Sequence, residues 1–369
     1  MAGRNGAPSA GAAVSDHEGS CLKLLLSSAS FSPSYGGPAY SVLGLAQSLA
    51  KRGMTVAVWS PDGSAPTATM QAMDDASDGV VALRGSFQSA LSSFGAPDVF
   101  HDSGLWWGHN REIAKTARRL GRPLVVSLRG MLEPAALKHR SWKKRIAWHL
   151  YQRRNLENAA ALHVTGDLEA KNVRVLGLRP EIICIANGLF VPKQCPDRDR
   201  AQLKRVVFLG RLHPIKGLPM LLEAWARIRP PDWSLEIAGP DEGGHRRVLE
   251  DHVIALALDK AVCFTGAVSG EEKKALFARG SLFVLPSLSE SFGVAAGEAM
   301  AAGLPVIATH GTPWAALETE GCGWHVATSV DGIEGGLRRA FSVPEEELIA
   351  MGQRGHRYAA RAFSWDRVA

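Results

Sequence analysis

Short apolar runs alternate with segments of helical period along most of this chain. The run at residues 22–28 is typical of a buried strand, and the next segment, residues 38–51, places Val42 and Leu49 on one helical face. A second apolar run, at residues 55–60, follows at once. This alternation predicts βαβ units, and therefore a parallel sheet covered by helices.

The alternation forms two series, separated by a polar stretch that begins after Asn187 and Gly188. The stretch holds two prolines and has no hydrophobic period, so it predicts a linker. Ser269 and Glu272 have the spacing of a capping box at a helix start in the second series. The remaining strands are expected at residues 124–127, 162–165, 181–186, 205–209, 234–238, 262–265, 282–285 and 305–308, with helices at 219–228, 271–278 and 293–302.

The chain has 369 residues, more than one hydrophobic core usually supports, so two domains are expected. Two Rossmann-like α/β halves would enclose a cleft, because open parallel sheets bind ligands at the carboxyl ends of their strands. We expect a disordered tail at residues 1–20, a first Rossmann-like domain at 21–188, a linker at 189–203, a second Rossmann-like domain at 204–363 and the start of a further helix at 364–369.

Composition narrows the class of protein. No apolar run approaches the ~18–20 residues of a membrane-spanning helix. The first twenty residues are rich in glycine, alanine and serine and lack the apolar segment of a signal peptide, so a cytoplasmic location is expected. The five cysteines are scattered without a CxxC pair, which argues against a disulfide framework and a zinc site.

The net charge of +6 is unevenly distributed. Residues 1–189 carry 21 basic and 14 acidic side chains, whereas the remaining residues carry 21 and 22. Within residues 101–154, 13 basic side chains face only three acidic ones. Such a field attracts nucleic acid, anionic lipid or phosphorylated small molecules, and charge alone does not choose among them.

Three strand-to-helix loops carry candidate chemistry. Gly36 and Gly37 open a helix, where free N–H groups suit an anion, although a tight turn alone explains them equally well. Arg211 and Lys216 lie five residues apart in one loop, so their charges can converge on a diphosphate unless they are ordinary surface charges.

The third loop contains Glu290, and Glu298 follows it in a helix of small residues. Two carboxylates suit sugar hydroxyls, because each can accept hydrogen bonds from neighbouring OH groups. The helix start between them suits phosphate. A structural reading, in which one acid caps the helix and the other lies on its surface, leaves unexplained a carboxylate among small apolar residues.

These motifs together resemble the family 4 retaining glycosyltransferases of GT-B fold, also called glycosyl transferases group 1, of the bacterial surface-polysaccharide type. The resemblance covers nearly the whole chain from residue 22, and the motifs follow one another in the family's order. The matching segments are the glycine-rich loop at Gly36, Asn187-Gly188, Gly210-Arg211-Leu-x3-Lys216-Gly217, Ala238-Gly-Pro-Asp-Glu-Gly243 and Glu290-x7-Glu298, followed by Ala-Met-Ala-Ala-Gly-Leu-Pro-Val-Ile.

The resemblance implies that the domain at 21–188 binds the acceptor, that the domain at 204–363 binds the nucleotide sugar, and that residues 364–369 start a cross-over helix. It also implies a role for each matching position. Arg211 and Lys216 would neutralise the donor diphosphate, Glu290 would hold the donor sugar, and these three are the expected catalytic residues. Glu298 would hold the ribose hydroxyls. The other expected donor-binding residues are Gly36, Gly37, Gly210, Ser291, Phe292 and Gly293. The resemblance also implies retention of anomeric configuration, with no bound metal and no cofactor beyond the nucleoside diphosphate sugar as co-substrate.

A fourth loop departs from the family pattern. Many members carry a histidine where this chain has Arg129, so no general base is assigned there. An arginine suits an anionic donor or an acceptor phosphate. His101 is the nearest other polar group at a strand end, and it is either part of the acceptor site or a structural histidine in a loop.

Residues 138–154 are basic and aromatic at helical spacing. Such a helix can lie on an anionic membrane surface, but its tryptophans can also pack on their own domain, and a nucleic-acid surface is the least favoured reading. The candidate membrane residues are Trp142, Lys143, Lys144, Arg145, Trp148, Arg153 and Arg154.

The predicted function is transfer of a sugar from a nucleoside diphosphate sugar to a hydroxyl of a glycan or lipid-linked acceptor, in surface polysaccharide or lipopolysaccharide biosynthesis. The expected setting is the cytoplasm, with peripheral attachment at the inner face of the membrane and no nucleic-acid partner. Two alternatives stay open: a nucleotide-sugar epimerase of the same fold, and a catalytically silent sugar-nucleotide-binding partner.

Overall fold

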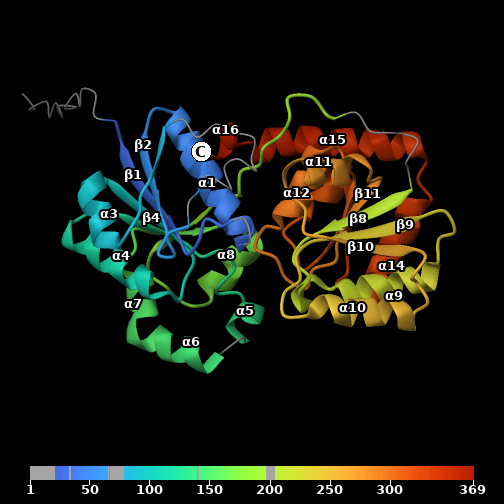
Figure 1. Ribbon diagram of the computed structural model, residues 1–369, viewed down its shortest axis with the longest axis horizontal. Helices are drawn as coiled ribbons and strands as arrows, with labels where there is room; N and C mark the ends of the chain where they lie inside the picture. Colours follow the sequence, from blue (N-terminus) through green and yellow to red (C-terminus); the bar gives the residue numbers. More distant parts are fainter. Residues whose placement is uncertain (1–20, 33–34, 65, 67–78, 139–140, 197–203) are drawn as a thin grey trace, which may run out of the picture.

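The computed structural model describes residues 21–32, 35–64, 66, 79–138, 141–196 and 204–369. The expected tail at 1–20 and part of the expected linker, 197–203, therefore lie outside the described residues. Two parallel sheets, each flanked by helices, lie side by side (Figure 1). The α/β class and the two Rossmann-like halves predicted from the sequence are confirmed.

The first sheet has strand order β3-β2-β1-β4-β5-β6-β7, and all of its neighbouring strands are parallel. Order reverses beside β1, so the loops after β1 and β4 diverge and leave a crevice at the carboxyl edge. The strands are β1 Lys23–Ser28, β2 Thr55–Trp59, β3 Val80–Ala82, β4 Val99–Ser103, β5 Leu124–Ser127, β6 Ala161–Val164 and β7 Glu181–Cys184.

The helices of this half begin with α1, Gly37–Lys51, whose buried face packs on β1 and β2. The others are α3 Phe87–Phe94, α4 Gly108–Arg119, α5 Pro134–Lys138, α6 Ser141–Ala147, α7 Arg153–Glu157 and α8 Asp167–Arg174, with a π-helical turn at Trp148–Gln152.

The second sheet has strand order β10-β9-β8-β11-β12-β13, again all parallel. Its strands are β8 Arg205–Leu209, β9 Ser234–Ala238, β10 Val262–Gly266, β11 Leu282–Leu285, β12 Val306–Thr309 and β13 Gly323–Val326. Its helices are α9 Leu218–Ile228, α10 His245–Ala255, α11 Gly270–Ala278, α12 Val294–Ala301, α13 Ala316–Thr319, α14 Val330–Phe341, α15 Glu345–Phe363 and α16 Trp365–Val368.

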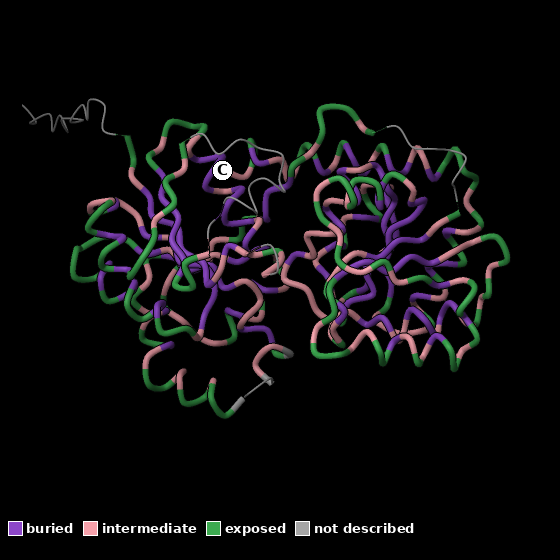
Figure 2. Tube along the Cα trace, viewed as in Figure 1, coloured by how far each residue is buried: buried purple, intermediate pink, exposed green. Residues whose placement is uncertain are grey.

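The hydrophobic core follows the sheets, as the buried traces in Figure 2 show. The central strands β8, β11 and β12 bury nearly every side chain, which explains why they appear in the sequence as continuous apolar runs. None of the described helices is both long and apolar enough to cross a membrane.

The end of the chain joins the two halves. Leu189 donates its N–H to the Phe363 carbonyl at 2.6 Å, and α16 then packs on α1 of the first half. The buried ring of Trp365 fills the space left by Gly44 of α1 and by Gly188, where an added Cβ would overlap the ring. The segment predicted to start a cross-over helix therefore contacts the first half, with Trp365 wedged against two glycines and Arg52 donating to the Asp366 carbonyl.

Candidate functional site

The loops after β8, β11 and β12 are held together at one edge of the second sheet. Gly217 closes the β8 loop with φ +65°, and an added Cβ there would overlap the Pro286 carbonyl of the β11 loop. The Leu288 N–H donates to the Ile215 carbonyl at 2.8 Å, and the Glu290 N–H donates to Gly311 at 2.9 Å. These bonds fix the backbone on which the expected catalytic side chains stand.

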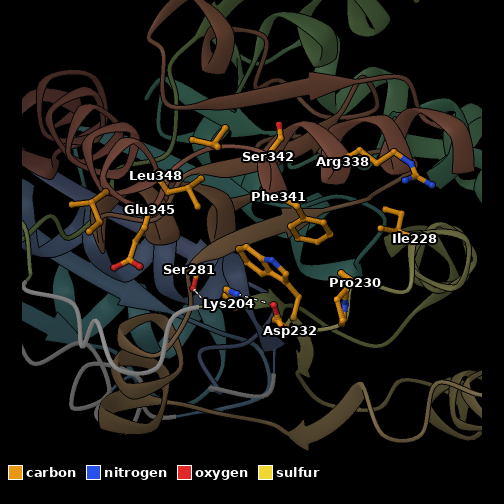
Figure 3. A pocket seen from close by; sticks show the side chains of 14 residues that line it. Lys204, Ile228, Pro230, Asp232, Ser281, Arg338, Phe341, Ser342, Glu345 and Leu348 are labelled. Atoms are coloured by element: carbon orange, nitrogen blue, oxygen red, sulfur yellow. Dashed lines mark hydrogen bonds and ion pairs between the residues drawn. The ribbon is translucent and has the colours of Figure 1, made fainter.

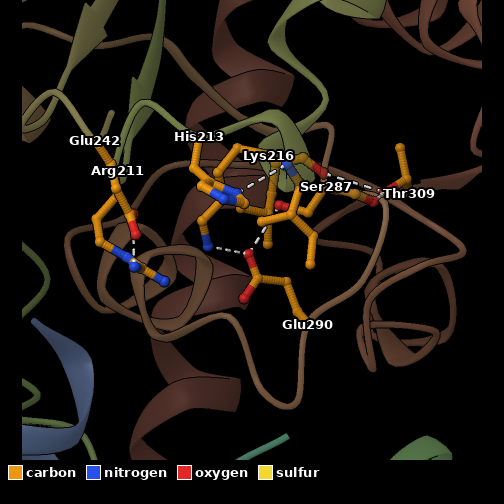
Figure 4. Close-up of polar contacts among 9 residues, drawn as sticks. Arg211, His213, Lys216, Glu242, Ser287, Glu290 and Thr309 are labelled. Atoms are coloured by element: carbon orange, nitrogen blue, oxygen red, sulfur yellow. Dashed lines mark hydrogen bonds and ion pairs between the residues drawn. The ribbon is translucent and has the colours of Figure 1, made fainter. Parts of the chain in front are cut away.

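Lys216 and Glu290 form the centre of this loop cluster (Figure 4). Lys216 Nζ lies 2.5 Å from Glu290 Oε1, and the Ser287 hydroxyl donates to the same oxygen at 2.8 Å. The two charged side chains are only 15% and 13% exposed, so they face each other away from bulk water. A lysine and a glutamate separated by 74 positions in the sequence are thus one charge pair, beside the start of α12.

Arg211 lies at the rim of the same cluster, as Figure 4 shows. Its Nη1 lies 2.6 Å from Glu242 Oε2, and both side chains are about half exposed. A surface ion pair of this kind is weak, because water screens it. The guanidinium can therefore exchange Glu242 for a more highly charged ligand at little cost.

Glu298 does not stand alone among apolar side chains. Its Oε1 lies 2.8 Å from Lys273 Nζ of α11, which was not identified from the sequence. Lys273 Nζ also lies 5.7 Å from the ring centroid of Tyr40 on α1. The carboxylate is therefore part of a contact between the two halves.

The starts of α1 and α12 approach each other from the two halves. Gly36 is the N-cap of α1 with φ +79°, and an added Cβ at Gly37 would lie 3.9 Å from Val294, the first residue of α12. Gly293 caps α12 with φ +77°. Two glycine-opened helix ends face the same space, which combines their partial positive charges.

The residues between Glu290 and α12 differ in exposure. Phe292 is buried, with its ring centroid 5.0 Å from that of Trp314 and 5.5 Å from that of Phe363, so its side chain anchors the loop. Ser291 faces the first half, because a Cβ added to Gly130 would lie 3.2 Å from its Cβ.

Arg129 lies next to that contact. It has φ +54°, an uncommon conformation for an arginine, and its Nη1 donates to the Asn187 side chain. Its Nε is buried and has no hydrogen-bond partner in the part of the chain that the structure describes. Burial lowers the pKa of Arg129 to about 10, so the guanidinium keeps its charge at neutral pH.

His101 belongs to a hydrogen-bonded chain inside the first half, and it lies in the middle of β4 rather than at a strand end. Its Nε2 lies 2.8 Å from the Ser127 hydroxyl, which lies 2.5 Å from His163 Nδ1, and His163 Nε2 lies 2.8 Å from the Ile185 carbonyl. Burial, aided by the charge of Arg129, lowers the pKa values of His101 and His163 to about 3 and about 4. These contacts favour the structural reading of His101.

The basic helix is α6, the π-helical turn and α7, at the lower side of the first half in Figure 1. Two of the residues expected on its outward surface, Lys144 and Trp148, face inward instead. The Trp148 ring centroid lies 6.3 Å from that of Trp106, and the Lys144 ammonium donates to the Ala136 carbonyl, so both face their own domain. The side chains that face outward are Trp142, Lys143, Arg145, Ile146, Leu150, Arg153 and Arg154.

A cavity of about 530 Å³ lies at the opposite edge of the second sheet (Figure 3). Two of the ion pairs of its lining are Lys204 with Asp232 at 2.9 Å and Arg338 with Glu334 at 2.9 Å. The Trp233 and Phe341 rings line it, 4.5 Å apart. It lies away from the strand carboxyl ends, so it is not the site described above.

The site residues missed from the sequence are Lys273, Tyr35 and Glu169, whose contacts join residues far apart in the chain. Tyr35 has its pKa raised by burial, while the charges of Arg211 and Arg129 oppose this, which places it near both arginines. Glu169 accepts from the Gly130 N–H at 2.5 Å. Of these residues only Tyr35 could have been identified from the sequence, since it lies in the glycine-rich loop beside Gly36.

Comparison with known proteins agrees with this arrangement. The sequence model for glycosyl transferases group 1 matches residues 197–357, and that for the glycosyl transferase 4-like domain matches residues 36–188. Over 307 residues the chain is 31% identical to the GDP-mannose:cellobiosyl-diphosphopolyprenol alpha-mannosyltransferase of Xanthomonas campestris, covering 79% of each. It is 30% identical to the D-inositol 3-phosphate glycosyltransferase of Corynebacterium urealyticum, covering 58% of this chain and 55% of that protein.

Solved structures share the fold at low identity. Sucrose-phosphate synthase from Thermosynechococcus elongatus superposes with a TM-score of 0.73 at 19% identity, covering 94% of this chain and 96% of that one. Anabaena HepE, crystallised with UDP and glucose, gives a TM-score of 0.74 at 18% identity, covering 94% and 97%. WaaG, a glycosyltransferase involved in lipopolysaccharide biosynthesis, gives 0.63 at 18%, covering 93% and 97%.

Proposed function

Because the chain belongs to the glycosyl transferases group 1 family, whose fold is GT-B, we propose that it is a retaining, metal-independent hexosyltransferase. It moves a sugar from a nucleoside diphosphate sugar to a hydroxyl of a glycan or lipid-linked acceptor. The observation that carries the proposal is the sequestered Lys216–Glu290 pair at 2.5 Å, set at the strand carboxyl ends beside the start of α12.

Transfer breaks the bond between the anomeric carbon and the diphosphate oxygen, and the electron pair stays on the diphosphate. The acceptor hydroxyl oxygen forms the new bond to the same carbon, and its proton passes to the leaving diphosphate oxygen, which has gained the electron pair. Lys216 and Arg211 stabilise the charge that develops on the leaving diphosphate, helped by the facing starts of α1 and α12. Glu290 holds the sugar hydroxyls, and Glu298 holds those of the ribose.

The acceptor is proposed from the relatives. The Xanthomonas enzyme is named for a diphosphopolyprenol-linked cellobiosyl acceptor, and WaaG for lipopolysaccharide biosynthesis. A role in surface polysaccharide or lipopolysaccharide assembly follows for this chain, in the cytoplasm at the inner face of the membrane. Trp142, Ile146 and Leu150 are 63%, 51% and 76% exposed among basic side chains, which supports peripheral attachment there.

The test is a panel of UDP- and GDP-sugars scored first by thermal shift and then by turnover with a lipid-linked acceptor. Binding to the folded state alone raises the unfolding temperature by mass action. A product with the donor's anomeric configuration, formed equally after EDTA treatment, is expected. Inversion would contradict retention, and activity lost with EDTA and restored by Mn²⁺ would contradict metal independence.

The same assay separates the two alternatives. An epimerase would convert the donor sugar without an acceptor, and a silent partner would bind the donor without turnover. The Glu290-x7-Glu298 arrangement favours the transferase over the epimerase by resemblance, and only Arg129, in place of the family histidine, favours the silent partner.

A further inference from the structure

Arg129 is a cation without a carboxylate ligand. Among the described residues it forms no ion pair, and its Nη1 donates to the neutral Asn187 amide. Its Nε–H is buried and has no acceptor among the same described residues. A charge that is partly withdrawn from water and lacks an oppositely charged partner is unfavourable, so an incoming anion that supplies one gains affinity.

The groups around Arg129 do not neutralise it through contact. His101 and His163 are neutral at pH 7, because burial lowers their pKa values to about 3 and about 4. The Glu169 carboxylate accepts instead from the Gly130 N–H at 2.5 Å and the Thr165 N–H at 2.8 Å. The guanidinium of Arg129 therefore keeps N–H groups that can donate hydrogen bonds to a ligand.

The backbone places this arginine at the reaction site. Arg129 and Gly130 have φ +54° and +72°, two consecutive residues in the left-handed region, and the strain of the first is typical of functional sites. An added Cβ at Gly130 would lie 3.2 Å from that of Ser291, which directly follows Glu290. An anion held by Arg129 is thus adjacent to the sugar that Glu290 is proposed to hold.

We propose that Arg129 is a specificity-determining residue that binds an oxyanion carried by one of the two sugar substrates. The inference rests on the proposed function and deepens it. The same chemistry has two sources: the carboxylate of a hexuronate in the donor, or a phosphate of the acceptor. A guanidinium suits both, because two parallel N–H groups match two oxygens of either.

Arg129→Met removes the charge at similar length, and Arg129→Lys keeps the charge without the fork. In the donor arm, dissociation constants of UDP-glucuronate and GDP-mannuronate are compared with those of UDP-glucose and GDP-mannose. In the acceptor arm, KM is compared for an oligosaccharide linked to polyprenyl diphosphate and for the same oligosaccharide without phosphate.

In one of the arms, Arg129→Met should raise the dissociation constant or KM of the charged substrate by roughly 10- to 100-fold. The value for the matching uncharged substrate should stay unchanged. Arg129→Lys should give an intermediate loss. The arm that responds identifies the source of the oxyanion. Equal loss for charged and uncharged forms in both arms, or no loss in either, would overturn the inference.

Binding of UDP and GDP alone separates this inference from the proposed function. Both arginine variants should retain the wild-type affinity for the nucleotides, which also shows that they fold. A loss of UDP and GDP affinity in Arg129→Met would overturn the inference, since the arginine would then serve the donor diphosphate. If the wild type binds neither nucleotide, the proposed function fails and this inference fails with it.

Discussion

Lys216 Nζ lies 2.5 Å from Glu290 Oε1, and together these side chains join the loops after β8 and β11 at the carboxyl edge of the second sheet. Each partner neutralises the charge of the other. Under the proposed function, a donor diphosphate would compete with Glu290 for the lysine, and a donor sugar would offer hydroxyls to the carboxylate. The two members of the pair would then separate onto two parts of one ligand.

Substitutions of Glu290 and of Lys216 should therefore affect different steps of the reaction. Glu290→Gln should lower kcat by about 10²–10³-fold while UDP and GDP still bind, because it removes a carboxylate from the reacting sugar. Lys216→Met should weaken the binding of the nucleotides themselves. Turnover and calorimetric titration measure the two effects, and Glu290→Ala should likewise abolish transfer while the protein stays folded.

Lys204→Met is the matched control. This lysine also pairs with a carboxylate, Asp232 at 2.9 Å, but at the opposite edge of the sheet and with both side chains more than half exposed. Wild-type kcat and nucleotide affinity are expected. Unchanged turnover in Glu290→Ala would overturn the assignment of the site.

The sequence predicted the elements that are apolar throughout and missed those that are polar or very short. Strands β8 and β11 lie at the predicted positions, because buried parallel strands leave a continuous apolar run. Strand β9 was also predicted, although Glu236 interrupts its apolar residues. The sequence signal fails for β13, Gly323–Val326, whose glycine and histidine interrupt any run. Ser269 is the N-cap residue of α11 as predicted, but its side chain makes no capping hydrogen bond.

The site likewise contains residues that the sequence identified and residues that it did not. Lys216 and Glu290 could be identified because each stands in a local pattern of loop and helix start. The partner of Glu298 could not, since Lys273 lies on a different helix and only the packing of α11 on the site brings them to 2.8 Å. Contacts between the two halves, such as Gly130 with Ser291, leave no periodic signal in the sequence.

The Trp365 wedge predicts a stability effect. Gly44→Ala and Gly188→Ala should each destabilise the protein by about 1–3 kcal/mol, because the added methyl group overlaps the buried indole. Trp365→Ala should cost about 3–5 kcal/mol by leaving a cavity. Denaturant unfolding measures all three changes in free energy.

Gly335→Ala provides the control, since a Cβ at this position in α14 meets nothing within 4 Å. It should stabilise the protein by about 0.5–1 kcal/mol through helix propensity. In the double variant Gly44→Ala/Trp365→Ala the cost of the extra methyl group should disappear. Additive costs would show that the glycine is required for a reason other than the indole.

The buried histidine chain predicts a pH dependence of stability. Burial lowers the pKa of His101 from its ordinary 6.5 to about 3, so between these values the unfolded chain binds a proton that the folded protein does not. The contribution of neutral His101 is therefore complete above pH 6.5 and declines as the pH falls. Between pH 7.5 and pH 5 the loss should be about 2 kcal/mol.

His101→Asn should remove that part of the slope even though it lowers stability at pH 7.5 by breaking the bond to Ser127. Asp102, whose pKa burial raises to about 6, acts in the opposite direction, and it cancels when the variant is compared with the wild type. Urea unfolding at pH 5, 6 and 7.5 measures the slopes. The exposed His149→Asn should keep the wild-type slope, and equal slopes in His101→Asn would contradict the prediction.

The outward face of the basic helix predicts membrane binding that depends on charge. Trp142 and Leu150 are 63% and 76% exposed, so truncating both should strongly weaken sedimentation with anionic vesicles at low salt, with little effect on stability. Lys143→Gln/Arg145→Gln should weaken binding by reducing attraction to anionic headgroups. Val248→Ala/Ile254→Ala, which removes exposed apolar groups from α10 of the other half, is the control and should bind as the wild type does. Equal binding of the wild type to neutral and anionic vesicles, or none at low salt, would exclude this helix as a membrane surface, because its attraction depends on both charge and buried apolar area.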